Sequence, residues 1–579
     1  MMQLDFQGLN KSFHGQKVLD NISGKINRGE KIGFIGANGI GKTTLARILA
    51  GEETPDTGII KYSPPSPEIF YLEQYPVFTP GITPYQELYQ TVLKYSKSKE
   101  NPDTLVKKSL NQAGIREKLW TQEAGSLSGG EKTKLMLAKV LVRDCDFLIL
   151  DEPTNHLDME SSAWLEEIVQ KMHKTVLVIS HDRYFLDKIA DKIWELTARG
   201  LKCYDGNYSS YKTQKEKELK NAQRDYEKQQ ARIKHLKETI NEMKNRYASA
   251  HKAAGQNDFY RAKAKKHAGA FKAKETELKR LEKNLVEMPK RPRSPAFEII
   301  NKNVLNTKLP PVLIQAENLM KKYGEKVVFQ NVSFNLRRGE KVALVGGNGT
   351  GKTTLLKIIC DIDREYQGSL KVNPSLHMGY FAQELEVLDH QASILDNVLT
   401  EQISVQEARI LLANLLFPGD DVFKKVAVLS MGEKCRVAFA KLILSGANLL
   451  VLDEPTNHLD IISKEKIEEV LEEFGGSVLL VSHDRYLVQR IAHKIMQLEE
   501  GQLKYYDGGY DYYLSKSRKE EKQRSAGIDD MDIINHIRRL EYELAYLGGK
   551  LSEKLDEEEK ARLNEEFLAK AKELNSYRK

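Results

Sequence analysis

Residues 33–45, GFIGANGIGKTTL, decide the fold of this 579-residue chain. The apolar segment GFIG has the character of a buried strand. It leads directly into a glycine-rich turn, and a helix is expected to begin after the lysine. Residues 36–43 match the pattern G-x-x-x-x-G-K-[ST]. In such a turn, glycines let backbone N–H groups point inward around phosphate oxygens, and the following helix N-terminus adds positive potential. The stretch therefore predicts a strand, a phosphate-binding loop and a helix.

The chain contains this stretch twice. ALVGGNGTGKTTL occupies residues 343–355, and its residues 346–353 match the same pattern. LILDEPTNHLD at 148–158 returns as LVLDEPTNHLD at 450–460, and VISHDRYFL at 178–186 returns as LVSHDRYLV at 480–488. The offset of about 300 residues is too long for a solenoid repeat, so we predict a duplicated domain. Apolar strands alternate with helical stretches in each copy, which predicts α/β domains at 1–210 and 311–514.

Composition limits the classes of protein that fit. Hydrophobic residues make up 40% and charged residues 30% of the chain. We find no apolar run of transmembrane length and no signal peptide in MMQLDFQGLN, so a cytoplasmic protein is expected. The cysteines form no C-x-x-C pair, which argues against a zinc or iron–sulfur site and favours reduced thiols. They are Cys145, Cys203, Cys360 and Cys435.

The segment between the two copies differs from both of them. Residues 212–293 hold 24 Lys and Arg against 11 Asp and Glu, although the whole chain carries only +7. Apolar residues at heptad-like spacing, from Leu219 to Ala250 and again from Phe271 to Met288, predict an antiparallel coiled-coil hairpin. The first helix would span roughly 50–60 Å at 1.5 Å per residue. We assign residues 211–300 to this hairpin and 515–579 to a helical C-terminal extension.

The repeated motifs supply the residues expected for ATP hydrolysis. Lys42 and Lys352 are expected to reach the β- and γ-phosphates. The aspartate that ends each LILD or LVLD strand is expected to hold Mg²⁺, and the glutamate that follows it is expected to orient or deprotonate the attacking water. A single histidine would more often be a core residue, but the same S-H-D-R-Y motif in both copies favours a γ-phosphate contact. The predicted Mg²⁺ ligands are Thr43, Asp151, Thr353 and Asp453, and the predicted catalytic residues are Glu152, Glu454, His181 and His483.

Taken together, these motifs resemble the ATP-binding-cassette superfamily of P-loop NTPases. The resemblance adds a Q-loop glutamine that ligates Mg²⁺ (Gln74, Gln383), a signature sequence (LSGGE at 127–131), and an aromatic ring against adenine (Phe13, Tyr323). It also implies that the two cassettes pair head to tail within one monomer, so that each ATP lies between one phosphate loop and the other cassette's signature. The remaining ATP-binding residues that it implies are Gly36, Asn38, Gly39, Gly41, Thr44, Ser128, Gly129, Gly130, Glu131, Gly346, Asn348, Gly349, Gly351, Thr354, Ser430, Met431, Gly432 and Glu433.

The second signature departs from the superfamily pattern. It reads LSMGE at 429–433, with Met431 in place of the first glycine. By the family geometry Met431 would face the ATP held by Lys42, where a side chain crowds a backbone–phosphate approach that glycine permits. We therefore expect the two sites to differ, without a ranking of their rates.

Two cassettes without a membrane span, the DEPTNHLD motif and a charged hairpin between the copies resemble the ABC-F family over essentially the whole chain. This resemblance implies binding to the bacterial ribosome, with rRNA and P-site tRNA as contacts and the hairpin directed toward the peptidyl-transferase centre. Residues 243–274 support an RNA partner independently, because nine Lys and Arg stand against one acid with aromatic residues interleaved. The expected contact residues at the hairpin tip are Phe259, Tyr260, Lys263, Lys265 and Lys266.

Several related functions remain as alternatives. Together, the linker, the LSMGE signature and the C-terminal extension resemble the ribosome-protection type of this family, which implies a role against lincosamides, pleuromutilins and streptogramin A. A housekeeping translation factor of the same family is the first alternative. The energising subunit of a membrane transporter would need a groove for coupling helices, and a chromosome-type ATPase would have the coiled coil inside one cassette. An ordinary solvated coiled coil is the plain alternative for the charged hairpin.

Overall fold

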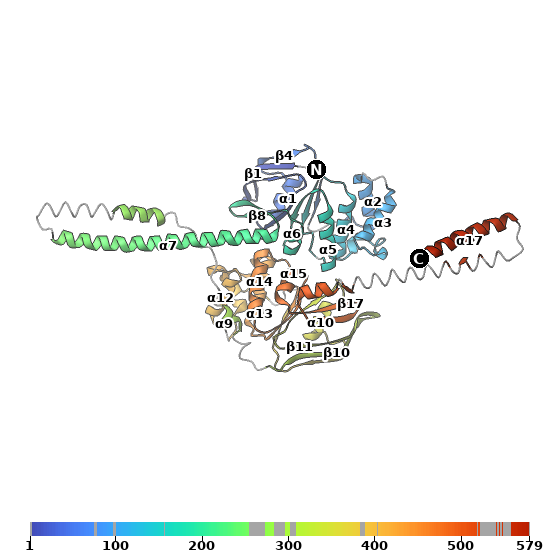
Figure 1. Ribbon diagram of the computed structural model, residues 1–579. Helices are drawn as coiled ribbons and strands as arrows, with labels where there is room; N and C mark the ends of the chain where they lie inside the picture. Colours follow the sequence, from blue (N-terminus) through green and yellow to red (C-terminus); the bar gives the residue numbers. More distant parts are fainter. Residues whose placement is uncertain are drawn as a thin grey trace.

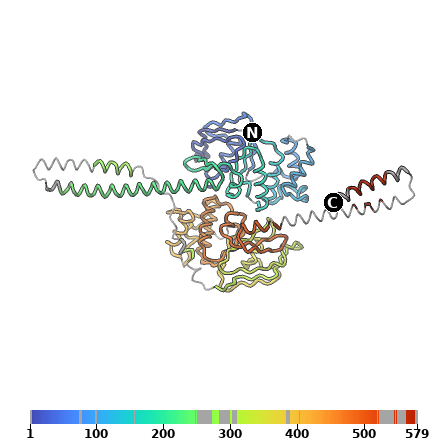
Figure 2. Tube along the Cα trace, in the orientation of Figure 1, coloured from blue at the N-terminus to red at the C-terminus, as the bar shows by residue number. Residues whose placement is uncertain are grey.

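The computed structural model describes residues 3–73, 78–96, 100–155, 157–253, 272–282, 296–301, 309–382, 388–401, 403–517, 519–520 and 557–577, together with residues 540, 543–544 and 547. Two cassettes lie against each other. Helix α7 (Tyr208–Ala253) extends away from them on one side, and α17 (Glu557–Tyr577) lies on the opposite side (Figures 1 and 2). The predicted architecture of two α/β cassettes is confirmed.

The first cassette is built on a six-stranded sheet of order β5-β6-β7-β3-β8-β9 and a three-stranded antiparallel sheet of order β2-β1-β4. In the larger sheet only the β8–β9 pair is antiparallel. Its strands are β3 (Lys31–Gly36), β5 (Ile69–Leu72), β6 (Phe147–Asp151), β7 (Thr175–Ile179), β8 (Lys192–Thr197) and β9 (Gly200–Asp205). The smaller sheet holds β1 (Gln3–Phe13), β2 (Gln16–Ile26) and β4 (Thr57–Ser63).

The central strands form because their sequences are almost continuous apolar runs. Every residue of β6 and β7 is buried, as expected for parallel strands that helices cover on both faces. The helices of the first cassette are α1 (Lys42–Ala50), α2 (Pro84–Tyr95), α3 (Pro102–Gln112), α4 (Gly129–Val142), α5 (Met159–Lys171) and α6 (Arg183–Ile189), with 3₁₀ turns at Glu117–Leu119 and Ala124–Ser126.

The phosphate-binding loop runs from the end of β3 to the start of α1. Gly41 has a φ of 104°, and a Cβ placed on it would lie 2.9 Å from the side chains of Val18 and Leu19. Gly351 repeats this geometry in the second copy with a φ of 102°. Only glycine adopts this left-handed conformation without strain, so the sequence pattern sets the loop's path.

The second cassette repeats the first in both sheets, of orders β14-β15-β16-β12-β17-β18 and β11-β10-β13. Its strands are β10 (Val312–Tyr323), β11 (Lys326–Arg337), β12 (Lys341–Val345), β13 (Gln367–Val372), β14 (Met378–Phe381), β15 (Leu449–Asp453), β16 (Ser477–Val481), β17 (Lys494–Glu499) and β18 (Gln502–Tyr506). Its helices are α10 (Lys352–Ile359), α11 (Ile394–Val398), α12 (Val405–Asn414), α13 (Met431–Leu444), α14 (Ile461–Glu473) and α15 (Arg485–Ile491), with 3₁₀ turns at Gly419–Phe423 and Val426–Val428. The short helix α9 (Ala296–Asn301) packs on this cassette, where Asn301 Nδ2 donates to Glu473 O at 2.9 Å.

Helix α7 is anchored to the first cassette by a cluster of three tyrosines. Tyr211 packs against Tyr204 with ring centroids 5.0 Å apart and against Tyr208 at 5.7 Å. The second cassette repeats the cluster where its own C-terminal helical segment, residues 510–517, begins. There Tyr513 lies 5.1 Å from Tyr506 and 5.9 Å from Tyr510.

The described part of the interdomain segment is a helical pair. Helix α7 and the helical residues 272–282 run side by side (Figure 1) and are joined by three ion pairs between basic residues of α7 and glutamates of the second helix. These pairs are Arg232–Glu277, Lys237–Glu282 and Lys244–Glu275. Ile233, Leu236 and Ile240 of the predicted seam are buried. The expected tip residues Phe259, Tyr260, Lys263, Lys265 and Lys266 lie outside the described residues.

Trp194 is the largest fully buried side chain of the first cassette, and it makes edge-to-face contacts with Phe6 and Phe34 at 5.7 and 6.1 Å. We expect Trp194→Ala to reduce the free energy of unfolding by about 3–5 kcal/mol, because the cavity left behind cannot fully collapse. Urea unfolding followed by circular dichroism measures the loss. Ile59→Ala, at a residue that is 61% exposed, is the control. Equal midpoints for the two variants would contradict the assigned core.

Candidate active sites

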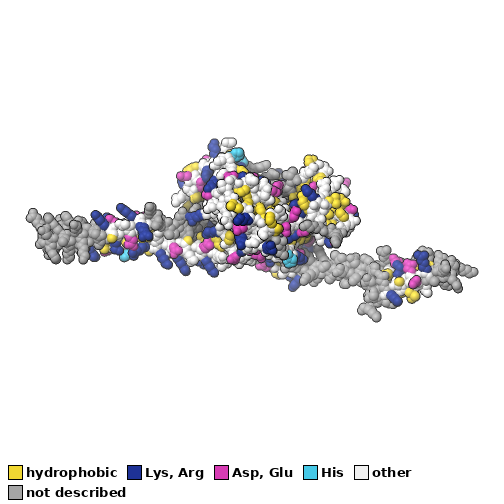
Figure 3. Space-filling view, turned by 90° about the horizontal axis from the view of Figure 1, so that it is seen from above, with side chains coloured by type: hydrophobic (Ala, Val, Ile, Leu, Met, Phe, Trp, Pro, Cys, Tyr) yellow, Lys and Arg dark blue, Asp and Glu magenta, His cyan; other side chains and the backbone are white. Residues whose placement is uncertain are grey.

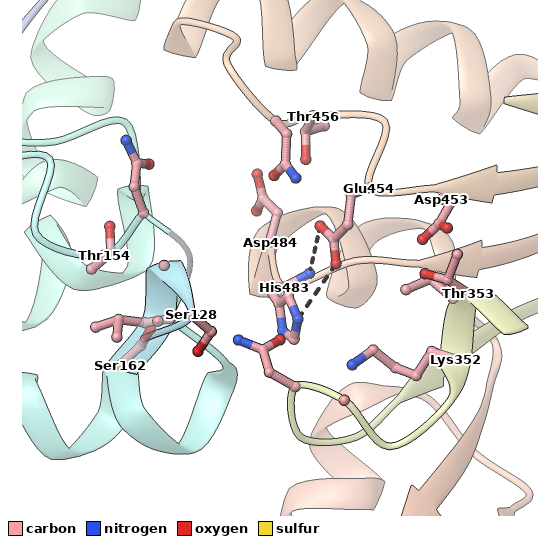
Figure 4. A pocket seen from close by; sticks show the side chains of 18 of the residues that line it. Ser128, Thr154, Ser162, Lys352, Thr353, Asp453, Glu454, Thr456, His483 and Asp484 are labelled. Atoms are coloured by element: carbon pink, nitrogen blue, oxygen red, sulfur yellow. Dashed lines mark hydrogen bonds and ion pairs between the residues drawn. The ribbon is translucent and has the colours of Figure 1, made fainter. Parts of the chain in front are cut away.

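Two cavities lie between the cassettes, with volumes of about 510 and 670 Å³. The smaller contains the phosphate-binding loop of the first cassette, including Lys42, and we call it the Lys42 site. The larger contains the loop of the second cassette, including Lys352, and we call it the Lys352 site. Figure 4 shows the Lys352 site, where Ser128, Thr154 and Ser162 of the first cassette face the loop and catalytic motifs of the second.

Both loop lysines point back into their own loops. Lys42 Nζ donates to the carbonyl oxygens of Gly36 and Ala37 at 2.9 and 3.0 Å, and Lys352 Nζ donates to those of Gly346 and Gly347 at 2.9 and 2.8 Å. Burial lowers the pKa of both lysines, while nearby carboxylates favour the charged form. Each ammonium is thus hydrogen-bonded to backbone carbonyls of its own phosphate-binding loop. A phosphate oxygen bound in the loop would take the place of these carbonyls as its partner.

The aspartates that end β6 and β15 are buried beside the loop threonines. The Thr43 hydroxyl hydrogen-bonds Asp151, and the Thr353 hydroxyl hydrogen-bonds Asp453. In the first cassette Tyr71 also donates to Asp151 Oδ2 at 3.0 Å. Asp453 Oδ2 is buried and has no hydrogen-bond partner among the described residues. Burial raises the pKa of both aspartates. A cation placed next to either carboxylate would therefore stabilise its charged form.

The glutamate that follows each aspartate contacts the histidine of the same copy. The backbone N–H of His181 donates to Glu152 Oε2 at 3.3 Å, and that of His483 donates to Glu454 Oε2 at 3.2 Å. The ring Nε2 atoms lie 3.5 and 3.6 Å from the other carboxylate oxygen (Figure 4 shows the second pair). The sequence prediction had both residue types in one site, and the structure brings them together.

The glutamates and histidines have perturbed proton affinities. Burial raises the pKa of Glu152 and of Glu454 above the ordinary value for a carboxyl group. Burial also lowers the pKa of His181 well below its usual range and that of His483 to about 4. The imidazoles are therefore neutral at pH 7, while the glutamates are stronger bases than an exposed carboxylate.

Each loop is also contacted by the opposite cassette. Asn38 N donates to Asp460 Oδ2 at 3.3 Å, and its Nδ2 donates to His458 O at 3.1 Å. In the mirrored contact Asn348 N donates to Asp158 Oδ2 at 3.3 Å. The cassettes are therefore arranged head to tail, and both cavities are composite.

The two sites differ at their signature sequences. Ser128, Gly129 and Gly130 line the Lys352 site. Among the described residues that line the Lys42 site, none comes from the second signature, residues 429–433. Met431 is 46% exposed, and its neighbour Gly432 lies close to Asn38 and the His458 carbonyl. In both copies the signature serine caps the helix that follows in a reciprocal pair with Glu131 or Glu433.

Two ion pairs join the cassettes through the S-H-D-R-Y motifs. Arg183 of the first S-H-D-R-Y motif binds Glu468 of the second cassette, and Arg485 of the second motif binds Glu166 of the first at 2.7 Å. All four side chains are at least 90% buried. Each guanidinium also lies over the tyrosine ring of the opposite motif, Tyr486 for Arg183 and Tyr184 for Arg485.

Sequence reasoning missed these interface residues, although the repeat held a signal for them. Arg183 and Arg485 stand at the same place in the two S-H-D-R-Y motifs, and Glu166 and Glu468 stand eight residues after the last aspartate of each DEPTNHLD motif. It also missed Tyr71. Gln74 and Gln383 lie outside the described residues. Tyr323 lines the Lys352 site, and Phe13 is 40% exposed beside Lys11, whose Nζ lies 5.2 Å from its ring centroid.

Comparison with known proteins agrees with this geometry. A family described as "ABC transporter" matches residues 19–155 and 329–457, and a second model, also described as "ABC transporter", matches 194–299, a range that includes α7. The solved structure of "RNase-L Inhibitor" matches with a TM-score of 0.58 at 20% identity, covering 86% of this chain and 90% of that one. The fold and the composite cavities define a tandem ATP-binding-cassette ATPase.

The relatives narrow the class further. The chain is 33% identical to "ABC transporter F family member 5" of Arabidopsis thaliana, over 90% of this chain and 79% of that protein. It is 34% identical to "Putative ATP-binding protein YdiF" of Bacillus subtilis, over 90% of this chain and 84% of that protein. It is 35% identical to "Ribosome protection protein VmlR" of the same organism, over 82% and 83%. The chain belongs to the ABC-F family.

The buried Arg485–Glu166 pair exists only when the cassettes meet. We expect Arg485→Met and Glu166→Leu each to weaken nucleotide-dependent closing by up to about 3–5 kcal/mol, because each leaves one buried charge without its partner. The double variant should recover most of this loss. Fluorescence energy transfer between labels on the two cassettes, with a non-hydrolysable ATP analogue, measures closing. Lys171→Met, which breaks the exposed Lys171–Glu167 pair on the same helix, is the control. A double variant as impaired as both single variants combined would contradict the pairing.

Proposed function

We propose that this protein is a ribosome-binding ATPase that protects bacterial ribosomes from antibiotics acting at the peptidyl-transferase centre. The observation that supports it most is a long, basic helical pair that lies between the two cassettes in the sequence and projects away from them in the structure. The two cassettes share two composite nucleotide sites. Two cassettes that close on ATP and open on hydrolysis give the helical pair two positions. The relative named "Ribosome protection protein VmlR" supports the choice of partner and of role.

We assign the nucleotide chemistry to residues of both cassettes. The loop backbone and Lys42 or Lys352 would bind the phosphates, and Thr43, Asp151, Thr353 and Asp453 would hold Mg²⁺. The donor set fits this hard cation, because it consists of hydroxyl and carboxylate oxygens and Asp453 Oδ2 is buried without a hydrogen-bond partner among the described residues. Mg²⁺ would neutralise charge on the phosphate oxygens.

The glutamates are assigned the step that involves water. Glu152 Oε1 and Glu454 Oε1 are buried and have no hydrogen-bond partner among the described residues. Such an oxygen can accept a hydrogen bond from a water molecule and orient it toward the γ-phosphate. The neutral imidazoles of His181 and His483 would place an N–H toward the same phosphate while contacting the glutamate of their own site.

The hairpin is assigned the contact with RNA. Lys and Arg side chains are distributed along the described part of α7, as the space-filling view shows (Figure 3). Cations of this kind neutralise backbone phosphates without reading sequence. Its proposed contacts are rRNA and P-site tRNA, with the tip residues near the drug-binding nucleotides. No described helix is long and apolar enough to cross a membrane.

The first experiment tests the ATP-dependent ribosome binding. We expect Glu152→Gln with Glu454→Gln to keep ATP binding and to lose turnover, because the amide cannot act as a base. The closed protein should then stay bound to ribosomes and inhibit growth when overexpressed. Ribosome pelleting with ATP measures trapping, and an inactive-loop variant, Lys42→Ala with Lys352→Ala, is the control. Normal ATP turnover in the glutamine variant would contradict the proposal. So would a glutamine variant that does not pellet with ribosomes in the presence of ATP.

The second experiment tests the antibiotic role. Expression in a susceptible bacterium should raise the minimum inhibitory concentration of a lincosamide, a pleuromutilin or streptogramin A. Phe259→Ala or Tyr260→Ala should reduce this effect while ribosome pelleting and ATPase rates stay near wild type, because stacking rings act on bases and not on phosphates. Replacing Lys263, Lys265 and Lys266 should weaken pelleting itself. If expression of the wild-type protein raises the minimum inhibitory concentration of none of these drugs, the housekeeping translation factor is favoured.

A further inference from the structure

The helices α5 and α14 occupy equivalent places in the two cassettes but differ at one position that faces a nucleotide site. Each helix is capped by the last aspartate of its DEPTNHLD motif, which accepts a hydrogen bond from the backbone N–H of Ser161 or Ser463 at 2.9 Å. The residue that follows this serine is Ser162 in the first cassette and Lys464 in the second. The pseudo-symmetry of the interface is therefore broken by one long cationic side chain.

Lys464 reaches across the interface to the first cassette. Its Nζ donates to the backbone carbonyl oxygen of His181 at 3.2 Å and lies 3.3 Å from Asp484 Oδ2 of its own cassette. The side chain is 13% exposed and lines both cavities. The ammonium is thus held between an aspartate of one cassette and the backbone of the other.

Ser162 makes no equivalent contact. It lines the Lys352 site from the first cassette (Figure 4), and no hydrogen bond joins its hydroxyl to the second cassette in the part of the chain that the structure describes. Its side chain is also three bonds shorter than that of Lys464. Among the residues that the structure describes, the His483 carbonyl therefore has no counterpart of the Lys464 contact made by His181.

The contact with His181 acts on a residue that touches the reacting groups. His181 donates its backbone N–H to Glu152 Oε2, and its ring Nε2 lies 3.1 Å from Asn38 Oδ1 of the phosphate-binding loop. A cation fixed on the carbonyl of the same residue restricts the position of both the backbone and the ring. After burial and Lys42, Lys464 also contributes to holding the pKa of His181 below its usual range.

We propose that Lys464 is a positioning residue that acts in trans on the Lys42 site: by binding the His181 carbonyl only when the cassettes are closed, it makes hydrolysis at that site dependent on closure. The Lys352 site, which has Ser162 at the equivalent position, uses its complete two-glycine signature without this hold. The two sites therefore differ in what they require for hydrolysis. The proposal rests on the ATPase activity alone and not on the identity of the ribosomal partner.

The test measures the two sites separately in the full-length protein. In a Glu454→Gln background, where turnover comes from the Lys42 site, Lys464→Met should lower kcat about tenfold. KM for ATP should change by less than about twofold, because Lys464 acts on the positioned catalytic groups and not on ATP binding. In a Glu152→Gln background, where turnover comes from the Lys352 site, kcat should stay within about twofold. Lys464→Arg, which keeps a cation of similar reach, should restore the Lys42 site.

The matched control is Lys466→Met, two residues along α14, where the lysine pairs with Glu469 on the same helix. If either background turns over too slowly, photocrosslinking of 8-azido-ATP trapped with vanadate identifies the site that has hydrolysed, since the labelled peptide derives from one cassette or the other. Lys464→Met should then shift the label away from the Lys42 site. An equal loss at both sites, no loss at the Lys42 site, or failure of Lys464→Arg to restore it would overturn the proposal.

Discussion

Two crossed ion pairs between the cassettes, Arg183–Glu468 and Arg485–Glu166, are the interaction on which both nucleotide sites depend. Each arginine follows the histidine of its own site by two residues, so the interface and the catalytic groups are built from one short motif. A buried ion pair adds little net stability when it replaces well-packed apolar residues, but it strongly penalises any arrangement that leaves one charge alone. This interface therefore favours a defined closed position over partial closure. The half-buried rings of Tyr486 and Tyr184 that lie over the two guanidiniums add to the same selectivity.

The asymmetry between the sites has two independent sources. One is the signature, in which Met431 stands where the family pattern has a glycine, and none of the described residues that line the Lys42 site comes from that signature. The other is Lys464, which contacts the Lys42 site from the opposite cassette. Both differences lie in the second cassette, and both concern the part of the interface next to the Lys42 site. The Lys352 site keeps the regular two-glycine signature and a short serine. A duplicated chain can change one site in this way without altering the strands and helices that support both.

The sequence predicted the elements that local chemistry determines. The glycine-rich loops, the buried strands that end in Asp151 and Asp453, and the repeat itself are visible because each needs particular residue types at a fixed spacing. It did not predict Tyr71 beneath Asp151 or Lys464 beside His181. These contacts join residues 80 and 283 positions apart, and nothing in a single sequence marks a tyrosine or a lysine as a long-range partner. The paired arginines could have been noticed, since the repeat preserves them, but their glutamate partners could be chosen only once the cassettes were placed together.

Helix α7 begins at this same interface. Tyr208, in its first turn, lies 6.3 Å from Tyr486, the ring that also receives the Arg183 guanidinium. The helix is 46 residues long, which corresponds to roughly 70 Å at 1.5 Å per residue. A turn of about 10° at its root would displace its far end by roughly 12 Å. The helix is thus a lever whose fulcrum is a tyrosine cluster at the junction of the cassettes, and a small rotation between two ATPase domains becomes a displacement on the scale of a nucleotide at a distant point.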